Sequence, residues 1–362
     1  FSLVKKSKSE NSSSKDARFP RILCGDWNHV RSLSLCMPIE EKDGIISDLK
    51  IDLLPKKLVR LKLVTPNIFG LLAPGSNGDG WTIRSVCPLL EDLHLESDDS
   101  FNSKLLTTLP SLTSLKIISP AKTSFLRADD FSKLPSSLLS MDFKLSASIV
   151  WIPGNSSMPP DLRNVDLSFY GCHELLRYLP QTVETFHTKN IELEKEAVNL
   201  PIGLKSLTMG VSGAGAIFGP LGASALPRSL TVLSLVVHRI DGPEEFVRCL
   251  PSTLRRLLAV TRRLDPIDAS ALPPSLTLLF GSIQISNESM AGVPVGMIHL
   301  RLDTINMEEQ VKHLPRGLKS LALSSRTPIS SDILLMLGEH LPHLETFQVH
   351  PHDALDFASS LP

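Results

Sequence analysis

Apolar residues recur along this chain in one phrase: Leu-Pro, two spacer residues, then Leu-x-x-Leu-x-Leu. Clear copies of this phrase begin at Leu54, Leu200, Leu226 and Leu314. From Leu90 onward, the first apolar residue of each copy follows the previous one by 21–26 residues. A period of this length indicates a solenoid of stacked repeats. The first apolar positions of the fourteen copies are Val30, Leu58, Leu90, Leu112, Leu138, Leu162, Val183, Leu204, Leu230, Leu254, Leu276, Met297, Leu318 and Leu344.

The spacing within the phrase predicts a short strand. Its last two apolar residues alternate, so both side chains point to one face. One copy buries three or four such side chains at roughly 1.5–3 kcal/mol each. Ordering about two dozen residues costs roughly 1–2 kcal/mol apiece in backbone entropy, so a single copy cannot fold alone. We therefore expect an α/β solenoid over residues 19–362, with about 14 parallel strands in a concave sheet.

The proline of the phrase separates the strands from the segments between them. It lacks an N–H and biases the preceding residue toward an extended conformation, so it ends any helix before it. The acids of residues 241–245 precede an apolar run that stops at Pro251, and residues 331–341 form a similar run. These patterns predict short helices, 3-10 turns or loops on the convex side of the solenoid.

On these residues the chain resembles the leucine-rich-repeat proteins, from about Phe19 to its last residue. The phrase is similar to the Leu-Pro-type repeats of some bacterial effectors and to the proline-containing repeats of amoebal proteins. The third position after the last strand Leu, usually Asn or Cys in this family, here holds residues such as Pro66, Asp98 and Arg262. We therefore expect an irregular arc that is less curved than the usual horseshoe. The resemblance implies a non-enzymatic scaffold that binds another protein through its concave face.

Composition narrows the cellular setting. A net charge of −1 gives no general attraction to nucleic acid or membrane, and no apolar run reaches the ~18 residues of a membrane span. The five cysteines are odd in number and contain no CxxC, which favours a reducing compartment. Three Asn-x-Ser/Thr triplets, at Asn11, Asn155 and Asn287, point weakly toward secretion. We expect a cytoplasmic or nuclear protein, with secretion as the lesser alternative.

The two ends of the sequence differ from the repeats. Residues 1–18 are polar and of low complexity, which predicts a disordered tail or linker. The last two residues, Leu361-Pro362, open another copy of the phrase, and terminal repeats need a polar cap. We therefore expect the natural protein to continue at both ends, and the repeat array to be a monomeric part of a longer chain.

Candidate chemistry is sparse. The glycine-rich stretch 210–219 lacks the Lys-Ser/Thr of a phosphate-binding loop, so a loop between repeats is the better interpretation. Cys172-His173 and residues 350–353 have no partners at a metal-binding or nucleophile spacing. We predict no catalytic residue, no metal and no cofactor, and we therefore do not expect this chain to be an enzyme.

The side chains between the apolar positions of each strand point to the opposite, concave face. These are polar in most copies, but in three consecutive copies they become apolar. They lie on neighbouring strands about 4.8 Å apart, which predicts one apolar patch with a polar rim, typical of a protein-binding site. The alternative is a register shift, suggested by Gly281 at an apolar position, which would place some of them in the core. The patch comprises Val232, Val236, Leu258, Val260, Leu278 and Phe280, and its rim Arg256, His299 and Arg301.

Three kinds of function fit this sequence. The first is a protein-interaction scaffold with an unknown protein partner, in its sharper form the substrate-recognition part of an F-box-type ubiquitin-ligase adaptor. The second is the recognition part of an effector whose catalytic domain lies outside this chain. The third is a secreted recognition receptor. The F-box form rests on the family resemblance rather than on particular residues.

Overall fold

The computed structural model describes residues 2–4, 29–36, 54–65, 86–97, 112–120, 125–150, 157–170, 172–189, 197–210, 217–261, 267–281, 285–302, 308–325 and 331–351. The chain divides into two compact units, unit 1 (Phe1–Thr188) and unit 2 (Lys189–Pro362). In each unit, parallel strands follow the repeat phrase and lie side by side in the order of the sequence.

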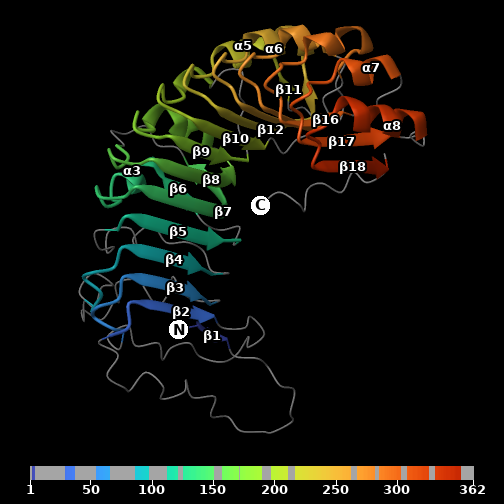
Figure 1. The fold of residues 1–362 in the computed structure, drawn as a ribbon. Coiled ribbons are helices and arrows are strands. Elements are labelled where there is room, and N and C mark those ends of the chain that lie inside the picture. Colours follow the sequence, from blue (N-terminus) through green and yellow to red (C-terminus); the bar gives the residue numbers. More distant parts are fainter. Residues whose placement is uncertain are drawn as a thin grey trace, which may run out of the picture. The chain divides into compact units, whose positions relative to one another are not determined.

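Unit 1 contains a parallel sheet with one strand for each copy of the phrase from Val30 to Val183, as predicted (Figure 1). A further short strand, β6, pairs with the C-terminal part of the long strand β7. The strands are β1 (Ser2–Val4), β2 (Ser32–Cys36), β3 (Arg60–Val64), β4 (Asp92–Glu96), β5 (Ser114–Ser119), β6 (Phe125–Arg127), β7 (Ser140–Val150), β8 (Asn164–Tyr170) and β9 (Thr185–Thr188). The described helical segments are α3 (Ala128–Phe131) and the 3-10 helix η4 (Cys172–Tyr178).

The first residues differ from the expected tail. Ser2–Val4 form β1, which pairs in parallel with β2, with Leu3 opposite Leu35. The rest of residues 1–18 lies outside the described part of the chain, so the disordered tail stays a prediction there.

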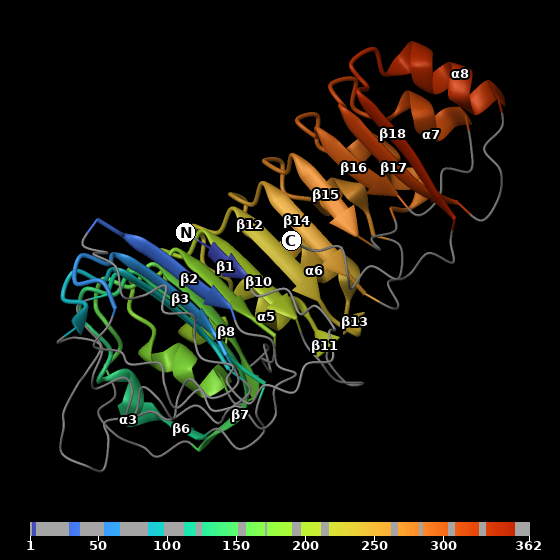
Figure 2. The ribbon, with the colours of Figure 1, turned by 90° about the horizontal axis from the view of Figure 1, so that it is seen from below.

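Unit 2 contains a second run of parallel strands, again one for each copy of the phrase, from Leu204 to Leu344. Its helices lie on one face of these strands (Figures 1 and 2). The strands are β10 (Ser206–Gly210), β12 (Val232–Val236), β14 (Arg256–Val260), β15 (Leu278–Gly281), β16 (His299–Leu302), β17 (Ser320–Ser325) and β18 (Thr346–Pro351), with a separate pair β11 (Ile217–Phe218) and β13 (Arg239–Ile240). The helices are η5 (Ala197–Asn199), α5 (Pro220–Ser224), α6 (Pro243–Cys249), η6 (Ala269–Ala271), η7 (Asn287–Gly292), α7 (Glu308–Lys312) and α8 (Ser331–His340).

The strands stack in register, so that equivalent apolar residues meet across the sheet. Leu233, Leu257, Leu279, Leu300 and Leu321 are paired one to the next and are all buried. Stacking therefore builds a continuous ladder of apolar side chains, the apolar ladder, which no single repeat could bury by itself. The core of unit 2 lies between this ladder and the helices.

Most of the described strands are entered through a turn that contains the proline of the phrase. The backbone N–H of the first apolar residue donates to the carbonyl of the residue three positions earlier, as Leu254 does to Pro251 at 3.0 Å and Leu318 to Pro315 at 3.0 Å. A proline can occupy this first turn position because its carbonyl accepts and no N–H is required of it. The turn redirects the chain from the helical side into the strand.

The predicted helices at residues 241–250 and 331–341 are present as α6 and α8. Helix α6 begins at Pro243, with two acids in its first turn, and its C-cap residue Leu250 precedes the next proline. Phe246 of α6 packs edge-on against Phe218 of β11, with ring centroids 5.6 Å apart. This aromatic pair joins α6 to β11, which belongs to the separate strand pair β11–β13.

A ladder of hydroxyl groups joins successive repeats, and the sequence pattern did not predict it. The residue before the first apolar position is often Ser or Thr, and its hydroxyl donates to carbonyls of the preceding repeat. Ser229 reaches the Leu204 carbonyl at 2.8 Å, Thr253 the Leu230 carbonyl at 2.9 Å, and Ser275 the Leu254 carbonyl at 2.7 Å. We call Ser229, Thr253 and Ser275 the hydroxyl ladder of unit 2. Ser137 and Thr182 make the same contact in unit 1.

Backbone hydrogen bonds between neighbouring repeats continue one residue past the end of several strands. The residue two positions after the last apolar strand residue is buried, and its N–H bonds directly to the next strand. Thr65 donates to the Glu96 carbonyl, and Ser97 to the Ile118 carbonyl, both at 3.0 Å. These bonds pair two buried backbone groups beyond the strands. Two of the positions usually held by asparagine, Pro66 and Asp98, lie outside the described residues, so the irregular arc stays a prediction.

Candidate protein-binding surface

The structure places all six residues of the predicted apolar patch outside the core. Each of them is half-buried, whereas the alternating residues Leu233, Leu235, Leu257 and Ala259 are fully buried. Because side chains alternate along a strand, the patch residues lie on the face of the unit 2 sheet turned away from the apolar ladder. We call this face, which is the side of the sheet opposite the helices and the one expected from the sequence to be concave, the outer face.

The frame of the repeat is kept through β15, where the sequence suggested a register shift. Leu279 pairs with Leu257, and Gly281 pairs with Ala259. Gly281 has φ +132°, and a Cβ there would lie 1.9 Å from the Ala259 carbonyl oxygen. The glycine is therefore required by the close approach of β15 to β14, and Leu278 and Phe280 remain on the outer face.

The pairing of the strands brings five of the six patch residues into one group. Val236 lies opposite Val260, and Leu258 lies opposite Phe280. Val260 and Leu258 follow each other on one face of β14, as do Phe280 and Leu278 on β15. Val232 is different, because its neighbour across the strands is Arg256. The apolar patch is thus continuous except at Val232.

Arg301 is closer to the patch than a rim residue would be. It lies opposite Ala322 on β17, it is only 8% exposed, and its guanidinium carbon is 5.1 Å from the centroid of the Phe280 ring. A cation over an aromatic face contributes about 0.5–2 kcal/mol, the larger values where water is excluded. Arg301 therefore holds the Phe280 ring in place and forms one wall of the patch.

The other two rim residues are exposed. Arg256 lies between Val232 and Leu278, and His299 lies on the far side of Leu278. No acidic residue occurs in the seven strands β10, β12, β14, β15, β16, β17 and β18. The outer face of unit 2 therefore combines apolar side chains with basic ones, and Glu345, directly before β18, interacts electrostatically with His299.

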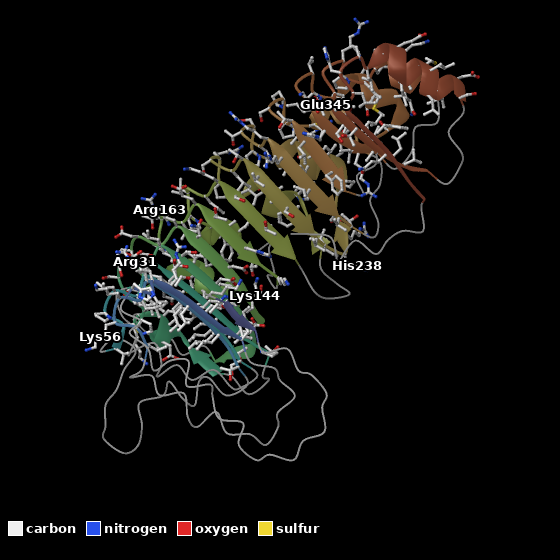
Figure 3. The ribbon with its side chains drawn as sticks, turned by 60° about the horizontal axis from the view of Figure 1, so that its bottom comes forward. Arg31, Lys56, Lys144, Arg163, His238 and Glu345 are labelled. Atoms are coloured by element: carbon white, nitrogen blue, oxygen red, sulfur yellow. The ribbon has the colours of Figure 1, made fainter. Side chains whose placement is uncertain are left out.

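The equivalent strands of unit 1 carry charges of both signs, and these neutralise one another. Lys116 is 2.8 Å from Asp142, and Arg60 is 3.3 Å from Asp92. Lys144, labelled in Figure 3, lies within 3.8 Å of Asp142. Such part-exposed pairs contribute little stability each, but they leave this face without a strong net charge.

Two of these unit 1 groups have shifted pKa values. Burial, followed by the charge of Lys62, lowers the pKa of His94 to about 4. Burial would raise the pKa of Asp166, but its hydrogen bond to His187 and the nearby charges outweigh burial and lower it. Near neutral pH His94 is therefore uncharged and Asp166 is ionised.

The described residues bring together no group suited to metal binding, since no three His, Cys, Asp or Glu side chains converge there. The thiol of Cys87 is buried, donates to the Pro55 carbonyl at 3.8 Å, and has its pKa raised by burial to about 11. A thiol of this kind is a structural residue rather than a nucleophile. The side chains of Cys172 and His173, and the loop 211–216, lie outside the described part of the chain.

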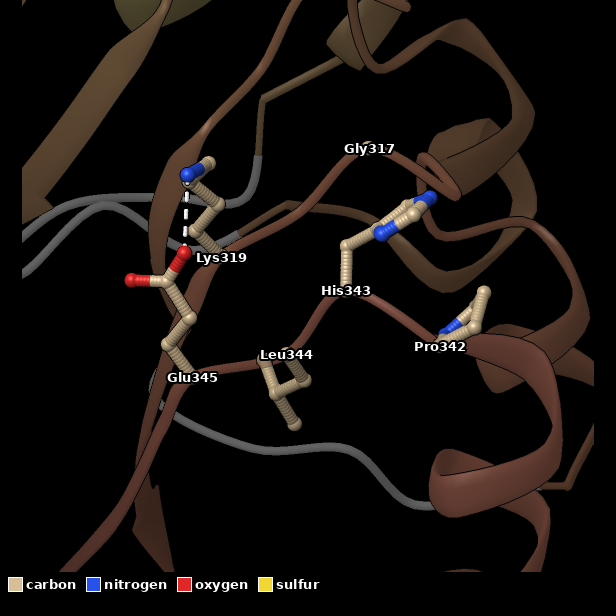
Figure 4. Close-up of a pocket in the computed structure, with 6 residues that line it drawn as sticks. All are labelled: Gly317, Lys319, Pro342, His343, Leu344 and Glu345. Carbon is tan, nitrogen blue, oxygen red and sulfur yellow. Dashed lines mark hydrogen bonds and ion pairs between the residues drawn. The ribbon is translucent and has the colours of Figure 1, made fainter.

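A shallow hollow lies at the start of β17 and β18, lined by Gly317, Lys319, Pro342, His343, Leu344 and Glu345 (Figure 4). Across its mouth, the Lys319 ammonium donates to a Glu345 carboxylate oxygen at 2.7 Å. The two charged groups thus satisfy each other. The remaining lining residues are Gly317, Pro342, His343 and Leu344, and we assign no chemistry to this hollow.

Comparison with known proteins supports the fold. The circular leucine-rich-repeat protein CroV588 matches with a TM-score of 0.51 and 18% identity, over 82% of this chain and 44% of that one. The internalin inlF of Listeria monocytogenes matches with a TM-score of 0.46 and 15% identity, over 76% of this chain and 84% of that one. No protein-family model matches the sequence. No curated protein matches it either.

The strand order, the repeat register and the likeness to CroV588 together define a leucine-rich-repeat fold. This chain spans under half the length of CroV588, so the likeness concerns architecture. Among the described helices, the longest is α8 with ten residues, and none is long and apolar enough to cross a membrane.

Proposed function

We propose that this protein is a non-enzymatic recognition module that binds a partner protein through the apolar patch of unit 2. The observation that carries the proposal is the group Val236, Leu258, Val260, Leu278 and Phe280, which is apolar, half-buried and on the outer face. The equivalent positions in the described strands of unit 1 hold mainly charged or polar residues. The core needs apolar residues on the ladder side only.

The energetics of the patch favour a partner. Side chains such as Leu258 and Phe280 are already partly covered by their neighbours, so they lose less conformational entropy when a partner binds. Covering their remaining apolar surface contributes roughly 25 cal/mol per Å². Arg301 fixes the Phe280 ring, and a rigid aromatic flanked by Arg is the typical centre of a protein interface.

The test is a selection from a library of surface-displayed peptides, followed by affinity measurement on the wild type and two variants. The patch variant is Leu258→Ser with Val260→Ser. The control is Val295→Ser, which removes an apolar side chain that is 90% exposed at a turn of the same unit. Loss of an interface centre of about 2 kcal/mol or more should weaken Kd at least ~30-fold, and the control should stay within about twofold.

Circular dichroism and thermal melting of each variant accompany the affinities, because both changes are on the surface and the fold should persist. If the patch variant melts like the wild type and still binds the selected peptides with unchanged affinity, the proposal is wrong. If the double variant is unstable, Val236→Ser alone repeats the test at the edge of the patch.

The finer expectations about this protein remain proposals. They are a monomeric module, a cytoplasmic or nuclear location, and a role as the recognition part of an F-box-type adaptor or of a larger effector. No described residue favours one of these roles over the others. A partner identified through the patch would decide among them.

A further inference from the structure

Basic and apolar residues alternate along one row of the outer face. Val232, Arg256, Leu278 and His299 stand in register on four neighbouring strands. Neighbouring strands are about 4.8 Å apart, so Arg256 and His299 are separated by roughly 10 Å, with Leu278 between them. Leu258, Phe280 and Arg301 form the next row, parallel to the first.

Among the described residues Arg256 has no recorded ion pair, whereas the Glu345 carboxylate directly before β18 interacts electrostatically with His299. The ion pairs recorded among the described residues of unit 2 join Lys319 with Glu345, Arg239 with Asp241, and Arg248 with Glu244. The last of these lies within helix α6 on the other side of the sheet. In unit 1, by contrast, acids on neighbouring strands meet the cations directly.

Any partner that covers Leu278 must also cover the residues beside it. A buried guanidinium without a counter-charge costs several kcal/mol, whereas a paired and hydrogen-bonded one can be neutral or favourable. A basic partner would therefore be rejected at this row. A neutral one would leave Arg256 partly dehydrated and without compensation.

Resting on the function proposed above, we infer that the partner is an acidic and apolar protein segment. It places an apolar side chain on Leu278, a carboxylate toward Arg256 and a hydrogen-bonding polar side chain toward His299. Two polar side chains about 10 Å apart occur two turns apart on an amphipathic helix, with apolar residues one turn from each, at a rise of about 5.4 Å per turn. The spacing of the row thus suits a helix that crosses the strands.

The inference is tested with the same displayed library, selected in parallel on the wild type, Arg256→Glu and a control, Arg316→Glu. Arg316 is exposed in a turn of unit 2 and away from the row. We expect wild-type binders enriched in Asp and Glu, with affinity about tenfold weaker for Arg256→Glu and falling as salt is raised. Binders selected on Arg256→Glu should instead be enriched in Lys and Arg.

The outcomes separate this inference from the proposed function. If the patch variant abolishes binding but the selected peptides carry no excess of acids, the acidic partner is wrong and the recognition function stands. If Arg256→Glu and Arg316→Glu behave alike, the inference is also overturned. Tight binding of a single-stranded oligothymidine at the row, competing with the peptides, would point to a nucleic acid and contradict it.

Discussion

Replacement of Gly281 by alanine tests how β15 is held against β14. Gly281 has φ +132°, a conformation that residues with a side chain rarely adopt. A Cβ added there would stand 1.9 Å from the Ala259 carbonyl oxygen and 2.6 Å from its carbonyl carbon. The neighbouring atoms are backbone, so they cannot rotate aside as a side chain could.

The expected cost has two parts. Holding alanine in this backbone region costs about 1–3 kcal/mol. Forcing strands β14 and β15 apart to relieve the overlap costs a further ~1–3 kcal/mol, as in other overpacked cores. A total of about 4 kcal/mol in a unit of this size corresponds to a melting midpoint lowered by roughly 10 °C.

The assay is thermal unfolding followed by circular dichroism, with Gly296→Ala as the matched control. Gly296 lies in the turn before β16, and a Cβ there would meet nothing within 4 Å. The control should melt within about 2 °C of the wild type or slightly higher, because alanine restricts the unfolded chain. If Gly281→Ala melts within the same range as the control, the close approach of the two strands is not as described.

Four further outcomes follow from the packing and the shifted pKa values. Thr253→Val removes the hydroxyl hydrogen bonds to the Arg228 and Leu230 carbonyls and should lower the free energy of unfolding of unit 2 by about 1–2 kcal/mol, measured in urea. Thr208→Val on the outer face is the control and should change little. Equal effects of the two substitutions would contradict the hydroxyl ladder. The ring protons of His94 should titrate by NMR with a pKa of about 4, and Lys62→Met should raise that value, while Lys56→Met should not. Because the folded pKa of His94 lies below its ordinary value, the stability of unit 1 should fall as pH drops from about 6.5 toward 4. Cys87 should resist iodoacetamide in the folded protein and react after unfolding, in a peptide map by mass spectrometry; early labelling would contradict its burial.

Much of the candidate surface could be predicted from alternation alone. The apolar ladder and the outer face are two sides of the same strand, so a correct register assigns both. The sequence alone therefore assigns Leu279 to the core and Phe280 to the surface. The position of Arg301 was not, because its stacking on Phe280 depends on side-chain conformations and on the distance between β15 and β16. Arg301 was expected at an exposed rim and is largely buried.

The hydroxyl ladder shows why some contacts escape a sequence reading. Ser229, Thr253 and Ser275 occupy one position of the phrase, but other copies have Lys57, Gly203 or Gly317 there. The signal is therefore incomplete, and a serine in a turn is common for other reasons. Its role becomes visible only when the preceding repeat is in place to present its carbonyl groups.

The sequence by itself determined the repeat, the fourteen strands and the face on which each side chain lies, because period and alternation are local properties of the chain. The tertiary structure alone decided which residues meet across neighbouring strands. It separated Val232 from the rest of the patch and placed Arg256 and His299 on either side of Leu278. It also showed that Gly281 is required by the close approach of the Ala259 carbonyl. These depend on inter-strand register and backbone approach, which are set by residues more than twenty positions apart in the chain.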